Sequence, residues 1–246
     1  TNSRFLFILI SGTFLHTGVR LKCKGEAQVY FTDRSAGIRR QFSAFENYLH
    51  AETYLVGGEY TNGKEKSAIT GGVYPFSLTL PENLPCSFEG RYGRVRYSIR
   101  ALLDVTTIYR FSTNIIPFTV APILDLNRDP RSPQSKMYMG QTEPLNITMS
   151  LPVHGYVPGQ AIPIRILMTN SSTVLVKKIR IVVSYHSTEK TRKHKEIVVE
   201  VEQPVNKQSD TYDVTFDVPA VPPTGMIHCN IIDVLYTLKV RQSQIQ

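Results

Sequence analysis

The fold is decided by the stretch Tyr74-Pro-Phe-Ser-Leu-Thr-Leu-Pro-Glu-Asn-Leu-Pro-Cys-Ser-Phe-Glu-Gly-Arg-Tyr-Gly-Arg-Val-Arg-Tyr97, which continues as Ser98-Ile-Arg-Ala101. Apolar and polar residues alternate from Phe76 to Leu80, which is the period of a β-strand with one buried face. The alternation returns after Arg94, where apolar residues alternate mostly with arginines. The stretch therefore predicts two strands, the second with one apolar face and one basic face.

Proline and glycine mark the connection between these two strands. Pro81 and Pro85 bracket a turn, because proline cannot donate to a strand ladder and punctuates strand ends. We expect Gly90 and Gly93 to allow a tight reversal with positive backbone φ.

The rest of the chain repeats this pattern of short alternating segments separated by turn signals, without a helix of clear length. Regular turns between short strands are typical of a β-sandwich. A proline-rich segment between two sets of strands has the composition of a linker. The predicted strands are 19–31, 45–55, 72–80, 94–103 and 114–120, then 145–151, 161–170, 174–184, 193–202, 212–218 and 230–240. We therefore predict an all-β protein with domains at 1–121 and 142–246 and an inter-domain linker at 122–141.

Composition is that of a globular protein with a basic surface. The 246 residues suffice for one large or two medium all-β domains, and a hydrophobic content of 41% allows a real core. The net charge of +8 favours acidic partners such as phosphorylated tails, anionic lipid or nucleic acid, although it also serves solubility. Three dispersed cysteines, Cys23, Cys86 and Cys229, argue against a disulfide framework or a zinc site and fit a reducing compartment.

The first residues allow two interpretations. Phe5-Leu-Phe-Ile-Leu-Ile10 follows Arg4 and has the character of a signal-peptide core. However, the run is short, polar residues follow it, and no clear small-residue cleavage site is present. We interpret it as a buried strand. No stretch of the sequence reaches the ~20 apolar residues that a membrane-spanning helix needs.

Several motifs resemble the arrestin family. The opening stretch is similar to its N-terminal domain, in which P-F-x-L-x-L-P leads into S-F-E-G, and Leu124-Asp-Leu-Asn127 is similar to its inter-domain segment. Gly155-Tyr-Val-Pro-Gly-Gln160, Asn170-Ser-Ser172 and Val234-Leu-Tyr-Thr-Leu-Lys-Val240 resemble successive parts of its C-terminal domain. The resemblance covers about residues 15 to 240 and points to the α-arrestins, the arrestin domain-containing proteins.

The resemblance implies two tandem immunoglobulin-like β-sandwiches and a non-catalytic cytosolic adaptor without cofactor. Such a protein binds cytoplasmic parts of membrane receptors or transporters and couples them to ubiquitin-linked endocytic trafficking and protein transport at plasma membrane and endosomes. In the family, P-P-x-Y motifs of a C-terminal tail dock Nedd4-type ubiquitin ligases. This sequence contains no P-P-x-Y and stops soon after Val240. Ligase recruitment is therefore expected only of residues not present here.

Two basic stripes on predicted strands are the strongest site candidates. The family binds acidic or phosphorylated receptor segments on a basic surface of its N-domain, and the resemblance implies this role here. Arginine suits the role, because its planar guanidinium binds phosphate through two hydrogen bonds. The alternative is a solvated outer face whose charges prevent sheet aggregation. We call these residues the basic face: Arg20, Lys22, Lys24, Arg94, Arg96 and Arg100.

A second basic cluster falls at a predicted hairpin tip, which lysines at positions 177 and 178 and Arg180 are expected to join. A basic tip on a rigid sandwich is suited to contact anionic lipid, and its alternative is an ordinary solvated hairpin. The second cluster consists of Lys190, Arg192, Lys193 and Lys195.

No catalytic or metal-binding motif is present in the sequence, and the six histidines are scattered. The aromatic residues alternate as core residues and do not form a stacking platform for bases. We therefore expect the protein not to bind nucleic acid. Cys229 lies just before the last predicted strand. In one α-arrestin, the thioredoxin-interacting protein, a cysteine in a similar context pairs with thioredoxin, whereas an inert thiol is the ordinary case.

Two alternatives to the adaptor remain. A retromer-type structural coat subunit shares this fold and binds other coat proteins, but the S-F-E-G and D-L-N motifs favour the α-arrestin side. A secreted adhesion sandwich would require the first segment to be a cleaved signal, and the dispersed cysteines argue against it. An enzyme has the least support.

Overall fold

The computed structural model describes residues 6–10, 14–16, 18–35, 37–58, 67–69, 72–104, 110–121, 124–128, 136–142, 145–189 and 191–244. Its strands fall into two compact units. Unit 1 consists of Thr1–Pro122 together with Met226–Asp233, and unit 2 of Ile123–Gly225 together with Val234–Gln246. Apart from the 3-10 turn η1 (Leu126–Arg128), the regular elements of these described residues are strands, so the all-β prediction is confirmed. The described residues contain no helix long and apolar enough to cross a membrane.

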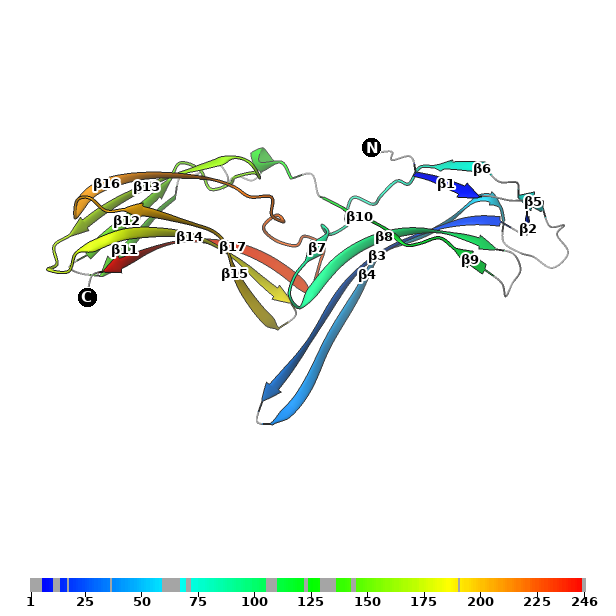
Figure 1. The fold of residues 1–246 in the computed structure, drawn as a ribbon, viewed down its shortest axis with the longest axis horizontal. Helices are drawn as coiled ribbons and strands as arrows, with labels where there is room; N and C mark the ends of the chain where they lie inside the picture. Colours follow the sequence, from blue (N-terminus) through cyan, green and yellow to red (C-terminus); the bar gives the residue numbers. More distant parts are fainter. Residues whose placement is uncertain are drawn as a thin grey trace. The chain divides into compact units, whose positions relative to one another are not determined.

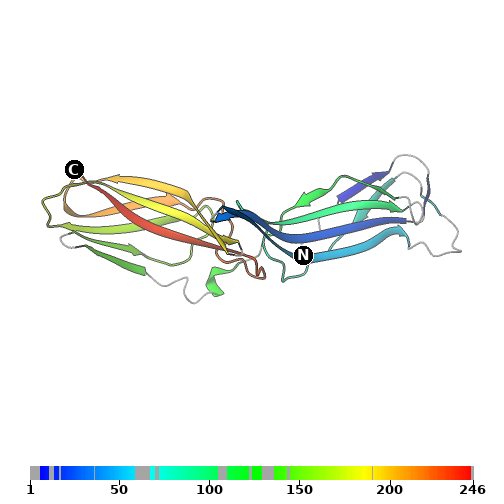
Figure 2. The ribbon, with the colours of Figure 1, turned by 90° about the horizontal axis from the view of Figure 1, so that it is seen from below.

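Unit 1 is built on one antiparallel sheet with the strand order β10-β8-β3-β4, in which β7 and β9 also pair with β8. Figure 2 shows β8, β3 and β4 running side by side. Two short ribbons accompany this sheet, β1 with β6 and β2 with β5. The strands are β1 Leu6–Ile10, β2 Phe14–His16, β3 Gly18–Ser35, β4 Ile38–Gly57, β5 Ser67–Ile69, β6 Gly72–Phe76, β7 Phe88–Glu89, β8 Gly93–Asp104, β9 Arg110–Ser112 and β10 Ile116–Phe118.

The core face of this sheet follows directly from the period-2 pattern. Alternate residues from Val19 to Phe31 in β3 are buried, and so are alternate residues from Gly93 to Ala101 in β8. The hydroxyl of buried Tyr97 donates to the carbonyl oxygen of Pro85 at 2.6 Å, which fastens the turn of the opening stretch to the sheet. The predicted strand 72–80 is shorter than expected. Pairing with β1 ends at Phe76, so the alternating residues 77–80 do not form a strand.

The predicted positive φ at Gly90 and Gly93 is wrong. Among the described residues, positive φ occurs at Gly37, Gly57, Gly159, Gly225 and His228. Gly93 instead begins β8 on the buried face, where a Cβ would lie 2.9 Å from Cγ2 of Val29. The glycine is therefore needed for close packing and not for backbone conformation.

Unit 1 also contains a segment from near the end of the sequence, residues 226–233. Met226 and Ile232 are buried, and Sδ of Met226 lies 3.3 Å from Sγ of Cys86. The backbone N–H of Asn230 donates to a carboxylate oxygen of Glu46 at 3.1 Å, and its side-chain amide donates to the other oxygen at the same distance. Residues 226–233 of the predicted domain 142–246 thus pack with the N-terminal strands through long-range contacts.

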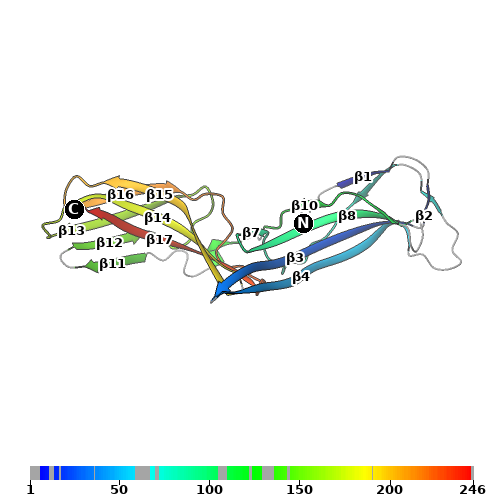
Figure 3. The same ribbon diagram turned by 60° about the horizontal axis from the view of Figure 1, so that its bottom comes forward.

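Unit 2 consists of two sheets, with the strand orders β11-β12-β13-β16 and β15-β14-β17. Figure 3 labels the strands of both sheets, and Figure 1 shows β13 and β16 over β14 and β17. The strands are β11 Lys136–Thr142, β12 Leu145–Leu151, β13 Ala161–Asn170, β14 Val176–Glu189, β15 Arg192–Pro204, β16 Ser209–Asp217 and β17 Ile232–Gln244. Residues 136–141 of the predicted linker 122–141 belong to β11, which pairs with β12 along its whole length.

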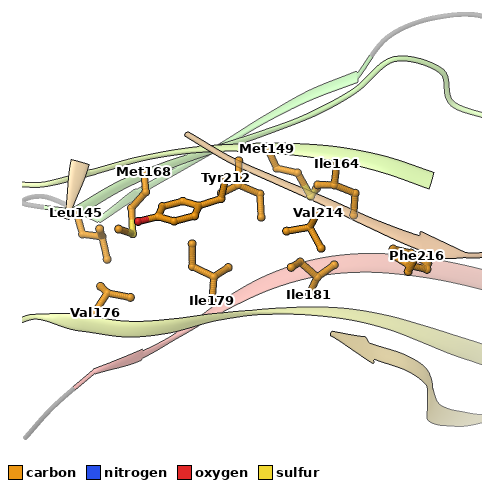
Figure 4. Close-up of a cluster of buried hydrophobic side chains, with 11 residues drawn as sticks. Leu145, Met149, Ile164, Met168, Val176, Ile179, Ile181, Tyr212, Val214 and Phe216 are labelled. Carbon is orange, nitrogen blue, oxygen red and sulfur yellow. The ribbon is translucent and has the colours of Figure 1, made fainter. Parts of the chain in front are cut away.

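The core of unit 2 lies between these two sheets. Figure 4 shows Met149, Met168 and Tyr212 from one sheet facing Ile179 and Ile181 from the other. The turns at the edges use the chemistry that the sequence indicates. Gly159 has φ +81°, and the side chain of Asn170 accepts a hydrogen bond from the backbone N–H of Ser172 at 3.0 Å.

Candidate binding surface

The six residues of the basic face lie together on the polar side of the unit 1 sheet. Because side chains alternate along a strand, residues of even number from 20 to 30 in β3 and from 94 to 100 in β8 point away from the buried face. The antiparallel register then places Lys22 opposite Arg100, and Gln28 opposite Arg94. The structure therefore brings the two predicted stripes into one surface.

Two carboxylates, from Glu52 in β4 and Asp104 in β8, reduce the charge at one end of this surface. One oxygen of Glu52 lies 2.6 Å from the guanidinium of Arg20, and the other lies 2.6 Å from Nζ of Lys22. Arg20 also contacts Asp104 at 3.3 Å. The hydrogen bond from Lys22, followed by the charge of Arg20, lowers the pKa of Glu52.

The other end of the basic face is paired within β3, β7 and β8. Arg96 forms a bidentate pair with Glu89, in which Nη2 lies 2.9 Å from Oε2. The hydrogen bond from Arg96 lowers the pKa of Glu89. Lys24 pairs with Glu26, and Arg94 donates to the side-chain amide oxygen of Gln28 at 2.8 Å.

Arg100 differs from the rest of the basic face. It is half-buried, its register partner in β3 is another cation, Lys22, and no carboxylate of the described residues forms an ion pair with it. Like charges directly opposite each other destabilise a sheet. An acidic group would therefore gain the most binding free energy at the centre of the surface, around Lys22 and Arg100.

Sequence reasoning missed the four carboxylates that pair with the basic face, Glu26, Glu52, Glu89 and Asp104. Glu26 stands two residues after Lys24 in the same strand, and this spacing places both side chains on one face. The other three come from different strands or from the far end of β8. Their positions depend on strand register, which the local pattern does not specify.

The second basic cluster lies at the turn between β14 and β15, as predicted. Lys190 is outside the described residues, Arg192 is half-buried, and Lys193 and Lys195 are exposed. The β14 side of this tip is buried, including Ser187 and Glu189.

The basic residues at positions 177 to 180 do not join this tip, contrary to our expectation. Arg180 pairs with Glu202 near the opposite end of the hairpin, with Nε 3.1 Å from the carboxylate, and Lys178 contacts the same carboxylate at 2.7 Å. They are nine or more residues from Glu189 along an extended strand of about 3.3 Å per residue.

Cys229 is half-buried and belongs to the segment 226–233 of unit 1. Its backbone N–H donates to the carbonyl oxygen of Met226 at 2.9 Å, which closes a turn. Burial, together with a hydrogen bond involving Cys229, raises the pKa of Tyr48. Burial also raises the pKa of the Cys23 thiol, to about 11, and of the Cys86 thiol. Neither of these two buried thiols has the low pKa of a reactive cysteine.

Within the part of the chain that the structure describes, no group of three or more histidine, cysteine, aspartate or glutamate residues is arranged to hold a metal ion. The fold defines a class of protein, a tandem β-sandwich, and its first unit carries a charged sheet face.

Comparison with known proteins identifies the family. The model of the arrestin (or S-antigen) N-terminal domain matches residues 8–127, and that of the C-terminal domain matches residues 141–243. The chain belongs to the arrestin family, whose members are generally non-catalytic adaptors.

Curated relatives point to the arrestin domain-containing branch. The chain is 28% identical over 257 residues to arrestin domain-containing protein 17 of Caenorhabditis elegans, which covers 92% of this chain and 59% of that protein. It is 30% identical over 182 residues to arrestin domain-containing protein 4 of Mus musculus, which covers 68% of this chain and 43% of that protein. The chain thus spans about two to three fifths of the length of these relatives.

Proposed function

We propose that this protein is an adaptor whose basic face binds acidic or phosphorylated cytoplasmic segments of membrane receptors or transporters. The observation that carries the proposal is the pair formed by Lys22 and Arg100, which lie opposite each other. Among the residues that the structure describes, Glu52 is the one carboxylate that pairs with Lys22, and none pairs with Arg100. A phosphate or carboxylate placed between them would relieve the repulsion of like charges and form charge-assisted hydrogen bonds. Membership of the arrestin family supports the adaptor role.

The resemblance extends the proposal to trafficking. An adaptor in the cytoplasm, recruited to plasma membrane and endosomes, would link its bound receptor to ubiquitin-linked endocytic sorting and protein transport. A Nedd4-type ligase would be recruited through a P-P-x-Y motif, which this sequence does not contain. The ligase part of the proposal therefore does not rest on the residues of this sequence.

The test combines direct binding with partner capture. The affinity of a fluorescent phosphorylated acidic peptide is measured for the wild type and for Arg94→Glu/Arg96→Glu/Arg100→Glu. We expect the variant to bind on the order of tenfold more weakly, because it loses charge-assisted hydrogen bonds and adds repulsion. The matched control reverses three exposed or half-exposed charges of unit 2, with Arg165→Glu/Lys178→Glu/Arg180→Glu, and should bind as the wild type does.

Capture from cytosol and membrane extract distinguishes the functions. Receptors or transporters that are recovered by the wild type and lost by the basic-face variant support the adaptor. Coat subunits in place of receptors support the retromer-type alternative. Identical partners for both proteins would mean that the basic face is only a solvated surface.

A further inference from the structure

The hairpin of β3 and β4 extends beyond the sheet of unit 1. The last residue of β3 that pairs with β8 is Val29, opposite Gly93. From Tyr30 onwards β3 pairs only with β4, up to Ser35 opposite Ile38. At about 3.3 Å per residue the six residues of this two-stranded ribbon extend roughly 20 Å past the sheet. Figure 1 shows it projecting beyond the other strands of unit 1.

One face of the ribbon fastens its base to the sheet. The ring of Phe31 is buried, stacks on Phe42 with 5.0 Å between ring centroids, and contacts Tyr92 edge-on at 6.0 Å. The backbone N–H of Tyr30 donates to the carbonyl oxygen of Tyr92 at 2.8 Å. A two-stranded hairpin alone is only marginally stable in water, and these contacts give the ribbon a fixed base.

The end of the ribbon carries a concentration of positive charge. Residues 30–45 contain three arginines and one aspartate, a net charge of +2. Arg34, Arg39 and Arg40 are exposed, and the register places Arg34 directly opposite Arg39. Like charges in that position destabilise the ribbon, so the arrangement lowers the stability of the hairpin unless an anionic surface compensates it.

An aliphatic side chain stands at the tip among these arginines. Ile38 is 57% exposed and follows Gly37, which has φ +79° and reverses the chain. Turn tips are normally polar, because exposing an aliphatic side chain to water is unfavourable in free energy. The combination of one exposed aliphatic residue with flanking arginines on a convex tip matches the requirements of the membrane interface, where apolar side chains enter and cations contact lipid phosphates.

We propose that the tip of the β3–β4 hairpin docks on an anionic lipid bilayer, with Ile38 inserted at the interface and Arg34, Arg39 and Arg40 on the headgroup phosphates. A bilayer is the occupant that fits, because a bare two-stranded tip has no walls to enclose a peptide and offers positive charge to a negative surface. One inserted side chain gives weak and reversible binding, as expected of a membrane contact that assists another interaction. The inference does not depend on the basic face or on its proposed partner.

The second basic cluster is the natural comparison for this tip. Both sites are basic turns of long hairpins, but the β14 side of the second tip is buried at Ser187 and Glu189, and its turn has no exposed aliphatic residue among those described. We therefore place the lipid contact at the β3–β4 tip in preference to Lys193 and Lys195.

The first test is sedimentation of the full chain with vesicles of equal parts phosphatidylserine and phosphatidylcholine, and with phosphatidylcholine alone. Wild type should bind the anionic vesicles, less so at high salt, and not the neutral ones. Arg39→Glu/Arg40→Glu should weaken binding on the order of tenfold or more. The matched control Lys193→Glu/Lys195→Glu should stay near the wild type. The opposite ranking of the two variants, or a wild type that ignores phosphatidylserine, overturns the proposal.

The second test reports where the bilayer is contacted. The chain has no tryptophan, so Ile38→Trp provides a single reporter at the tip, and Thr191→Trp provides one at the turn of the other hairpin. Emission from Ile38→Trp should shift to shorter wavelength with anionic vesicles, whereas emission from Thr191→Trp should not. If neither reporter shifts while the protein still sediments, another surface binds the lipid and the proposal fails. If Tyr30→Ser/Phe45→Ser abolishes vesicle binding and the tip variants do not, the lipid contact lies on the side of the hairpin and the proposal fails. The rings of Tyr30 and Phe45 on that side are 54% and 51% exposed.

Discussion

Gly25 lies in β3 directly against the ring of Tyr97, at a point where the register with β4 shifts by a bulge. A Cβ at this position would lie 2.4 Å from two ring carbons of Tyr97 and 2.9 Å from Cβ of Leu49. The ring cannot move freely, because its hydroxyl is bonded to Pro85 in the core. The position therefore admits only glycine for steric reasons.

We expect Gly25→Ala to lower the free energy of unfolding by about 2 kcal/mol or more, the range of overpacking in a well-packed core. Urea denaturation of the variant measures the effect. Gly58→Ala is the control, because its added methyl group would meet nothing within 4 Å. Equal stability of both variants would show that the ring of Tyr97 can give way.

Glu52 makes the stability of the basic face depend on pH. Its pKa in the folded protein is lowered from 4.5 by the hydrogen bond from Lys22 and by the charge of Arg20. A lowered folded pKa stabilises the protein above the unfolded value, and this contribution disappears as pH falls through the folded value.

We predict that Glu52→Gln unfolds more easily than the wild type at neutral pH, by at most about 1 kcal/mol because the pair is partly solvated. The difference should shrink as pH falls below the unfolded pKa of about 4.5 and vanish once pH is below the lowered pKa of the folded protein, since the wild-type carboxyl is then neutral as well. Urea titrations at several pH values measure it. A difference that persists in acid would assign the effect to packing or hydrogen bonding and not to charge.

At the scale of elements, β13 shows how the period-2 pattern divides side chains between core and solvent. Met168 is fully buried between the sheets of unit 2, whereas its neighbour Leu167 is 50% exposed. Successive residues of a strand point to opposite faces, so two adjacent large side chains have very different energetic roles.

We expect Met168→Ala to destabilise unit 2 by about 2–5 kcal/mol, because it removes buried methylene groups and leaves a cavity. Leu167→Ala on the other face should change stability by about 0.5 kcal/mol or less, as a surface substitution does. Thermal or urea unfolding of the two variants tests the assignment. Similar losses of stability in both variants would mean that the outer face of β13 is covered in solution.

At the scale of the whole chain, the contribution of residues 226–233 to unit 1 links the end of the sequence to the folding of its beginning. Met226 packs on Cys86, which burial keeps in the thiol form by raising its pKa. The reactivity of Cys86 therefore reports whether this distant segment is in place.

We predict that Met226→Ala increases the rate at which a maleimide labels Cys86 by roughly tenfold, since local opening becomes easier when the covering side chain is removed. Peptide mapping identifies which cysteine reacts. Met168→Ala, which truncates a buried methionine of unit 2 in the same way, serves as the control. If it accelerates labelling equally, Cys86 becomes accessible by global unfolding and not through loss of this segment.

Features that depend on local pattern could be predicted from the amino-acid sequence alone. Alternation of apolar and polar residues fixed the strands and their buried faces, as in Val95, Tyr97 and Ile99, and the motifs around them indicated the arrestin family. Turn chemistry was equally local at Gly159 and Asn170. The basic residues of β3 and β8 could be placed on exposed faces for the same reason, because period 2 assigns each side chain to one side.

Features that depend on contacts between residues far apart in the sequence required the three-dimensional structure. It brought the two basic stripes together through the register of β3 with β8, and it supplied Glu52 and Asp104 as their partners. It also placed residues 226–233 in unit 1 and extended the β3–β4 ribbon past the sheet. These features follow from which strands pair and in what register, and that choice is made by the packing of the whole core and not by any one segment.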